Sequence, residues 1–214
     1  MAALIFNFAS PAPAKSTPLK NPIKIVAFGD SLTAGYGLPR KAAFPIQLEK
    51  KLKASGQSVS VSNAGISGDT ASGGLARLNW AVPEGTNAVI LELGANDALR
   101  GVSPAITRRS LDKIMFRLKA RSIPVLITGM IAPQGMGDKY GRAFNSIYPD
   151  LAKKYDALYY PFFLKGVALD PKLNQPDGIH PTAKGVKIIV ENIGPSVLSL
   201  IKRVTDQTSM IAAD

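Results

Sequence analysis

The sequence contains no cysteine, and it contains one histidine among its 214 residues. Without cysteine, the chain can form neither a disulfide nor a thiolate-ligated metal site, and it cannot use a cysteine nucleophile. A single histidine excludes a metal site built from several imidazoles, and any chemistry that needs an imidazole must use His180. No apolar run reaches the about 18 residues that a transmembrane helix requires.

Acidic residues are scarce, since 15 Asp and Glu face 26 Lys and Arg and the formal net charge is +11. Such a charge can attract nucleic acid, anionic lipid or an anionic substrate. The basic residues occur in twos and threes on segments with helical apolar spacing, which indicates solvated helix faces. The aromatic interleaving of a single-strand binder is missing. We therefore expect no nucleic-acid partner and only a weak attraction to anionic lipid.

The chain divides into an arm, one domain and a tail. Residues 1–22 contain four prolines and no acidic residue, and Ala12-Pro13-Ala14 resembles a small-residue cleavage site. We expect an N-terminal arm or the remnant of a signal peptide there, which favours a periplasmic or secreted protein over a cytoplasmic one. Residues 23–203 have the length and apolar content of one domain, and the polar residues 204–214 predict a flexible tail. No pattern predicts an oligomeric state.

Short apolar segments alternate with segments of helical spacing through the domain. Strands are predicted at residues 23–28, 58–61, 87–93, 124–128 and 157–160. Helices are predicted at residues 42–54, from 104 onward, at 140–151 and at 183–203, the last with a break at Gly194-Pro195. Strands that are apolar on both faces are typical of a parallel sheet covered by helices on both sides. The sequence therefore predicts an α/β fold, a three-layer α/β/α sandwich with a five-stranded parallel sheet in the flavodoxin-like order 2-1-3-4-5.

Polar, glycine-rich segments follow the predicted strands. In an open parallel sheet, ligands bind just beyond the carboxyl ends of the strands. Three of these segments come after strands, and a fourth precedes the last helix: Gly29-Asp30-Ser31-Leu32-Thr33, Asn63-Ala64-Gly65-Ile66-Ser67-Gly68-Asp69-Thr70, Gly94-Ala95-Asn96-Asp97 and Asp177-Gly178-Ile179-His180-Pro181. All four are expected on one rim of the sheet.

These segments contain the groups that acyl transfer needs. A serine such as Ser31 becomes a nucleophile beside a base, and an aspartate such as Asp177 can orient the His180 imidazole. Amides near Gly68 and the Asn96 side chain can stabilise an oxyanion. Each residue also has an ordinary structural alternative, as a helix cap, a turn residue or a surface histidine. Their common position on one rim favours the catalytic interpretation.

The same segments resemble the four sequence blocks of the SGNH (GDSL) hydrolase family. Further segments are similar to the bacterial thioesterase I, lysophospholipase L1 and arylesterase branch of that family: Ile66-Ser67-Gly68-Asp69-Thr70, Leu75-Ala76-Arg77-Leu78 and Glu92-Leu93-Gly94. The resemblance spans about residues 23–200. Ala95 occupies a position where close relatives often have a second glycine, which bears on the shape of the acyl site.

The resemblance implies a role for each site residue. Ser31 would be the nucleophile, His180 the base and Asp177 the partner of the base. The oxyanion hole would consist of the Ser31 amide, the Gly68 amide and the Asn96 side chain, and Asp30 would help to position the site. No metal and no cofactor would take part.

The implied function is that of a serine esterase that hydrolyses small carboxylic esters or thioesters through an acyl-enzyme. Two alternatives stay open. One is a carbohydrate O-acetyl esterase of the same family. The other belongs to a different class, a non-catalytic basic α/β module that binds an anionic polymer or a membrane.

Overall fold

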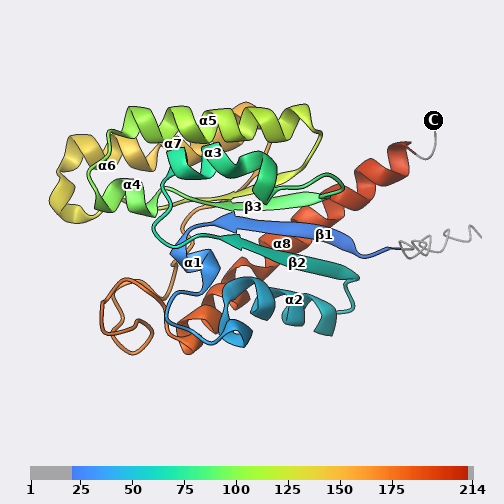
Figure 1. The fold of residues 1–214 in the computed structure, drawn as a ribbon, viewed down its shortest axis with the longest axis horizontal. Coiled ribbons are helices and arrows are strands. Elements are labelled where there is room, and N and C mark those ends of the chain that lie inside the picture. The colour runs from blue at the N-terminus through green and yellow to red at the C-terminus, as the bar shows by residue number, and fades with distance from the viewer. Residues whose placement is uncertain (1–20, 212–214) are drawn as a thin grey trace, which may run out of the picture.

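Five parallel strands form the central sheet of the structure, a computed structural model that describes residues 21–211 (Figure 1). Their order is β2-β1-β3-β4-β5, as predicted. The strands are β1 (Ile23–Gly29), β2 (Val59–Gly65), β3 (Ala88–Glu92), β4 (Val125–Thr128) and β5 (Leu158–Tyr160).

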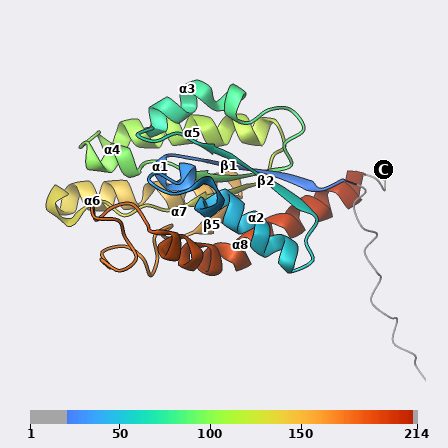
Figure 2. The same ribbon diagram turned by 60° about the horizontal axis from the view of Figure 1, so that its bottom comes forward.

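Helices cover both faces of this sheet, and the predicted three-layer sandwich is confirmed. One face carries α2 and α8, and the other carries α3, α5 and α7 (Figures 1 and 2). The long helices are α2 (Phe44–Ala54), α3 (Ala71–Ala81), α5 (Pro104–Ala120), α7 (Ile147–Tyr155) and α8 (Ala183–Ile211). Shorter helices are α1 (Ser31–Ala34), η1 (Arg40–Ala42), α4 (Ala95–Leu99), η2 (Gln134–Met136) and α6 (Asp138–Asn145).

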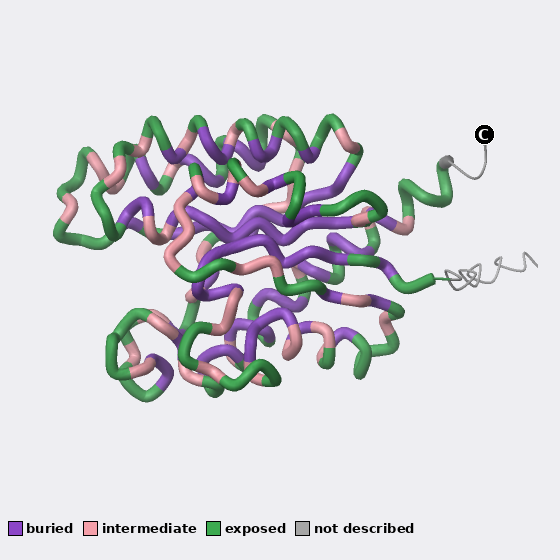
Figure 3. Tube along the Cα trace, in the orientation of Figure 1, coloured by how far each residue is buried: buried purple, intermediate pink, exposed green. Residues whose placement is uncertain are grey.

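The core lies along the sheet, where the tube of Figure 3 is almost continuously buried through the central strands β1, β3 and β4. Every residue of β3 and of β4 is buried. Helices remove both faces of these strands from water, so apolar side chains are favourable at successive positions and the alternation of a half-exposed strand is lost.

The strand register aligns the ends of β1, β2 and β3. Gly29 pairs with Gly65 on one side and with Glu92 on the other. A Cβ atom on Gly65 would lie 2.3 Å from the Ala34 backbone nitrogen, and one on Gly29 would lie 2.4 Å from a Glu92 carboxylate oxygen. Side chains are thus excluded at both positions, because the α1 backbone and the Glu92 side chain lie very close to the ends of β2 and β1.

Two helices differ from the sequence predictions. The predicted helix at residues 140–151 is two helices, α6 and α7, which meet at Ser146. The last helix does not break at Gly194-Pro195 and does not end at Arg203, because α8 runs on to Ile211. Its buried face continues past the proline through Val197, Leu200, Ile201 and Val204, so packing on the sheet outweighs the lost backbone hydrogen bond.

Residues 204–211 are therefore helical, where the sequence predicts a flexible tail. Most of the predicted arm, residues 1–20, lies outside the described residues. Among residues 21–211, none of the helices combines the length and the apolar character needed to cross a membrane.

Candidate active site

A chain of two hydrogen bonds connects three polar side chains at the carboxyl edge of the sheet. The Ser31 hydroxyl lies 3.0 Å from Nε2 of His180, and Nδ1 of the same ring lies 2.7 Å from Oδ2 of Asp177. Ser31 is buried, and the side chains of His180 and Asp177 are 15% and 37% exposed. The structure thus brings together the three predicted catalytic residues.

Ser31 reaches this position because β1 ends abruptly and α1 begins. Asp30, and not Ser31, is the N-cap of α1, and its Oδ1 accepts a hydrogen bond of 3.0 Å from the Leu32 N–H. The capping interpretation of Ser31 is therefore wrong, and the Ser31 hydroxyl is left for His180. The Ser31 N–H lies in the first turn of α1, where backbone N–H groups have no intrahelical acceptor.

His180 lies in the segment that precedes α8, and Gln175 holds this segment in place. The Gln175 N–H donates to the His180 carbonyl at 2.7 Å, and its side-chain amide donates to the carbonyls of Tyr36 and Pro181 at 2.8 and 3.0 Å. The Tyr36 ring covers the imidazole, with ring centroids 4.5 Å apart. His180 is thus held by two residues, Gln175 and Tyr36, that lie outside the predicted set.

Asp177 determines which imidazole nitrogen carries the proton. Its Oδ1 accepts from the backbone N–H groups of Ile179 and His180, both at 3.0 Å. These bonds and the bond to the imidazole lower the pKa of Asp177 to about 2. An ionised carboxylate only accepts, so Nδ1 of His180 donates to Asp177 and Nε2 is left to accept the Ser31 proton.

Gly68 lies in a turn between β2 and α3. The Asp69 N–H closes this turn on the Ile66 carbonyl at 3.1 Å, and Gly68 has a φ of +84°, which favours glycine. Within residues 21–211, the Gly68 N–H has no protein acceptor. The Arg100 guanidinium donates to the Gly68 carbonyl at 2.9 Å. The turn interpretation of Gly68 is correct, and it leaves one backbone donor free.

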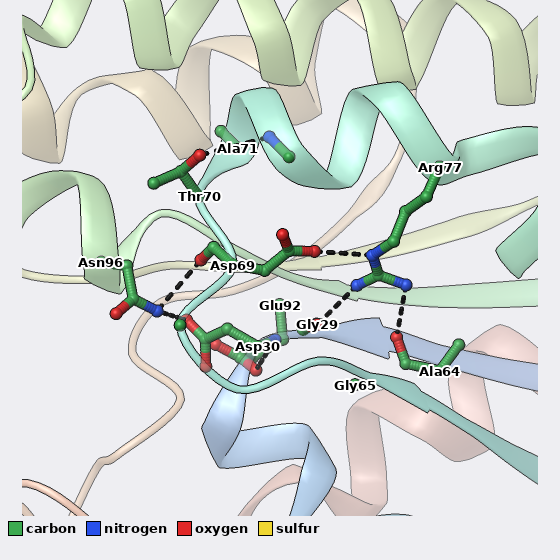
Figure 4. Close-up of polar contacts among 12 residues, drawn as sticks. Gly29, Asp30, Ala64, Gly65, Asp69, Thr70, Ala71, Arg77, Glu92 and Asn96 are labelled. Carbon is green, nitrogen blue, oxygen red and sulfur yellow. Dashed lines mark hydrogen bonds and ion pairs between the residues drawn. The ribbon is translucent and has the colours of Figure 1, made fainter.

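Asn96 lies in the first turn of α4 and points toward the β1 and β2 loops (Figure 4). Its side-chain amide donates to Oδ2 of Asp30 at 3.1 Å and to the carbonyl of Asp69 at 3.0 Å. Both amide hydrogens therefore have acceptors within the protein. To serve an oxyanion, Asn96 must share one of them with the substrate or transfer it.

Asp30 lies beside a second buried carboxyl group, Glu92 (Figure 4). Oε2 of Glu92 accepts from the Thr33 hydroxyl at 2.7 Å and from the Asp30 N–H at 3.3 Å, and its Oε1 is buried without a partner. Burial raises the pKa of both groups, and the Asp30 charge raises that of Glu92 further. Glu92 thus carries the proton of this pair, and Asp30 is the carboxylate that accepts from Asn96.

Sequence reasoning missed several residues that hold the site together. Glu92 and Arg77 lie in segments that resemble the family, but the sequence pattern predicts no role for either of them. Glu92 offered a signal, a carboxyl group at the end of an otherwise apolar strand. Tyr36 and Gln175 offered none, since both lie in loops whose path depends on the complete fold. Among the residues the structure describes, no group of three or more His, Asp or Glu side chains has an arrangement that could hold a metal ion.

Comparisons with known proteins agree with this arrangement of elements. A family model described as the GDSL-like lipase/acylhydrolase family matches residues 27–188. The thioesterase 1/protease 1/lysophospholipase L1 of Escherichia coli K12 is 38% identical over 178 residues, 83% of this chain and 84% of that protein. The esterase TesA of Pseudomonas aeruginosa is 36% identical and covers 83% of this chain and 89% of its own length.

Solved structures give the same result. The crystal structure of AlinE4, an SGNH-hydrolase family esterase, is 46% identical with a TM-score of 0.72, and the match covers 85% of this chain and 97% of that chain. The crystal structure of TesA is 36% identical with a TM-score of 0.79, and the match covers 83% of this chain and 99% of that chain.

Proposed function

The chain belongs to the GDSL-like lipase/acylhydrolase family and is a carboxylic ester hydrolase, and we propose that it cleaves small esters or thioesters through an acyl-enzyme on Ser31. The observation that carries this proposal is the hydrogen-bond chain from Asp177 through His180 to the Ser31 hydroxyl. A hydroxyl whose proton faces a neutral imidazole nitrogen is an activated nucleophile. This chemistry separates the proposal from a non-catalytic basic module.

Acylation begins when Oγ of Ser31 attacks the substrate carbonyl carbon and its proton passes to Nε2 of His180. The Asp177 carboxylate stabilises the imidazolium that forms. The tetrahedral intermediate then collapses, the bond to the leaving group breaks, and His180 gives the proton to the departing alkoxide or thiolate, which leaves as the alcohol or thiol. Deacylation reverses these steps with water in place of the leaving group. His180 takes a proton from water, the hydroxide attacks the acyl carbon, and the bond to Oγ of Ser31 breaks as His180 returns the proton to Oγ.

The carbonyl oxygen becomes negative at each tetrahedral intermediate. We assign its stabilisation to the N–H groups of Ser31 and Gly68 and to the Asn96 amide. No acceptor among the described residues takes the Gly68 N–H, so it can donate to the substrate. Asn96 can redirect one hydrogen from the Asp69 carbonyl while Asp30 keeps the other. Asp30 is then a positioning residue, because its carboxylate fixes the plane of the Asn96 amide.

Intact-mass spectrometry after treatment with a fluorophosphonate tests the nucleophile. We expect one adduct on the wild type and none on Ser31→Ala, which should also lose hydrolysis of p-nitrophenyl acetate. Ser55→Ala is the matched control, since that hydroxyl caps the far end of α2 on the Leu52 carbonyl at 2.8 Å. An adduct on Ser31→Ala would show that another residue is the nucleophile.

A substrate panel separates the esterase from the carbohydrate O-acetyl esterase. It should contain p-nitrophenyl esters of short, medium and long acyl chains, an acyl thioester and an acetylated sugar. We expect the highest kcat/KM among the simple esters or thioesters. A preference for the acetylated sugar would support the alternative instead.

We also propose that the protein is exported and that its net charge of +11 gives a weak attraction to anionic lipid. Support for export comes from the Ala12-Pro13-Ala14 pattern. N-terminal sequencing of the protein from its native host should find a start near Lys15, and a start at Met1 in the cytoplasm would contradict it. Binding to anionic vesicles should disappear at high salt, whereas salt-independent binding would contradict an electrostatic attraction.

A further inference from the structure

We propose that Arg77 is a positioning residue for the oxyanion hole, which it maintains by fixing the loop between β2 and α3 to the carboxyl end of β1. The proposal rests on the function proposed above and adds a residue that touches neither the substrate nor the catalytic triad. Arg77 lies on α3, and its side chain points toward Asp69 and toward the carbonyls of Gly29 and Ala64 (Figure 4).

The Arg77 guanidinium forms three hydrogen bonds with three different segments. Nη2 donates to the Gly29 carbonyl and Nη1 to the Ala64 carbonyl, both at 2.9 Å. Nε donates to Oδ2 of Asp69 at 2.6 Å. Gly29 ends β1 next to Asp30, Ala64 lies near the end of β2, and Asp69 follows Gly68, so one planar group joins the segments that must hold their relative positions.

The contacts continue from this group to the oxyanion donors. The Asp69 carbonyl accepts from the Asn96 amide at 3.0 Å, and the Ile66 N–H donates to the Gly29 carbonyl at 3.1 Å. Residues 66–70 belong to no strand or helix, so contacts of this kind define the path of the loop. The position of the Gly68 N–H thus depends on the anchor at Asp69.

Arginine suits this position for chemical reasons. Its guanidinium donates in several fixed directions within one plane, whereas the lysine ammonium is a point charge on a flexible stem. The side chains of Arg77 and Asp69 are only 12% and 15% exposed, and the guanidinium lies 4.5 Å from the centre of the Phe28 ring. An ion pair that is largely removed from water is weak evidence for net stability, because desolvation offsets the attraction. The three hydrogen bonds to three segments therefore indicate that Arg77 positions the loop.

The experiment compares Arg77→Ala with the wild type by steady-state kinetics on a p-nitrophenyl ester. A misplacement of about 1 Å in a catalytic group can cost about 10²-fold in rate. We expect kcat to fall about 10- to 100-fold while KM stays within about threefold, since the oxyanion donors act as charge develops. Millimolar guanidinium should restore part of kcat by occupying the vacated site, an effect that a general loss of stability would not give.

Arg121→Ala is the matched control, because Arg121 also donates to a backbone carbonyl, that of Pro83 at 3.0 Å, but lies at the C-terminal end of α5. It should keep the wild-type kcat and show no response to guanidinium. If Arg77→Ala folds poorly, Asp69→Asn/Arg77→Ala removes the unpaired, partly buried carboxylate and allows the same measurement.

A double-mutant cycle with Asn96→Ala completes the test. If Arg77 acts through the oxyanion loop, the loss from Arg77→Ala should shrink when Asn96 is already absent. Unchanged kcat in a folded Arg77 variant, no rescue by guanidinium, or additive losses in the cycle would each overturn the proposal. Ser31→Ala is measured in parallel: activity in that variant would refute the nucleophile, whereas an inactive Ser31→Ala beside a fully active Arg77→Ala would refute this inference alone.

Discussion

Replacing Asn96 by aspartate should harm both stability and catalysis, and the structure allows the size of the effect to be worked out. The Asn96 amide donates to Oδ2 of Asp30 and to the Asp69 carbonyl. Asn96→Asp removes both donors and places a carboxylate against two acceptors, one of them charged. Two like charges about 4 Å apart repel by about 4 kcal/mol at an effective dielectric constant of 20.

The repulsion makes the loss of stability depend on pH. About 4 kcal/mol corresponds to a rise of about 3 units in the pKa of the introduced carboxyl group, since one unit is about 1.36 kcal/mol. In the unfolded chain that group ionises near pH 4, so the folded variant keeps a proton that the unfolded variant has lost. The penalty is thus absent below about pH 4 and grows as the pH rises toward the raised pKa.

Melting temperatures and kinetics of Asn96→Asp and Asn96→Ala test this reasoning. A loss of 1 kcal/mol lowers Tm by about 2–4 °C in a domain of this size, so Asn96→Asp should melt about 8–16 °C below the wild type in mildly alkaline buffer and much closer to it near pH 5. Asn96→Ala should lose about 10²–10³-fold in kcat, and Asn96→Asp more. An Asn96→Asp variant with near-normal kcat and an unchanged Tm at alkaline pH would refute the assignment.

Three further substitutions have expected outcomes. Asp177→Asn should lower kcat about 10⁴-fold, because an amide NH₂ facing Nδ1 favours the tautomer whose Nε2 cannot accept the serine proton; near-normal kcat would contradict this. Glu92→Gln imitates the protonated acid. Above about pH 4.5 only the unfolded wild type releases this proton, so the Tm of the variant relative to the wild type should rise with pH. A Tm difference independent of pH would contradict a raised pKa of Glu92. Gly29→Ala would place a Cβ atom 2.2 Å from Oγ1 of Thr33 and should lower Tm by several degrees, whereas Gly141→Ala, with nothing within 4 Å, should not; equal melting temperatures would show that the strand end adapts.

The strands and the rim of the site could be predicted from sequence because local pattern and sheet topology determine them. β3 and β4 are short, largely apolar runs, and the parallel order follows from the alternation with helices. That order alone places Ser31 and Asn96 on one edge of the sheet. Their separation in the chain does not matter, because parallel strands all end at the same edge.

The remaining features depend on tertiary contacts that no local pattern encodes. Pro195 and Gly194 are helix-breaking residues, yet the buried face around Val197 keeps α8 continuous. Arg77 is the one charged residue of α3, and nothing in the sequence pattern of that helix shows which carbonyls will accept its hydrogen bonds. Both cases are decided by the packing of elements distant in sequence.

The proposed nucleophile Ser31 and the proposed base His180 lie 149 residues apart, one after the first strand and the other before the last helix. A nascent chain that ends before residue 180 carries the serine, the loop and the amide donors but no base, so it cannot turn over an ester. The rate of hydrolysis therefore reports whether the last segment has docked onto the sheet. Two fragments divided between β5 and Asp177 would regain activity only by reassociation, which makes this fold suitable as a split reporter with a colorimetric readout.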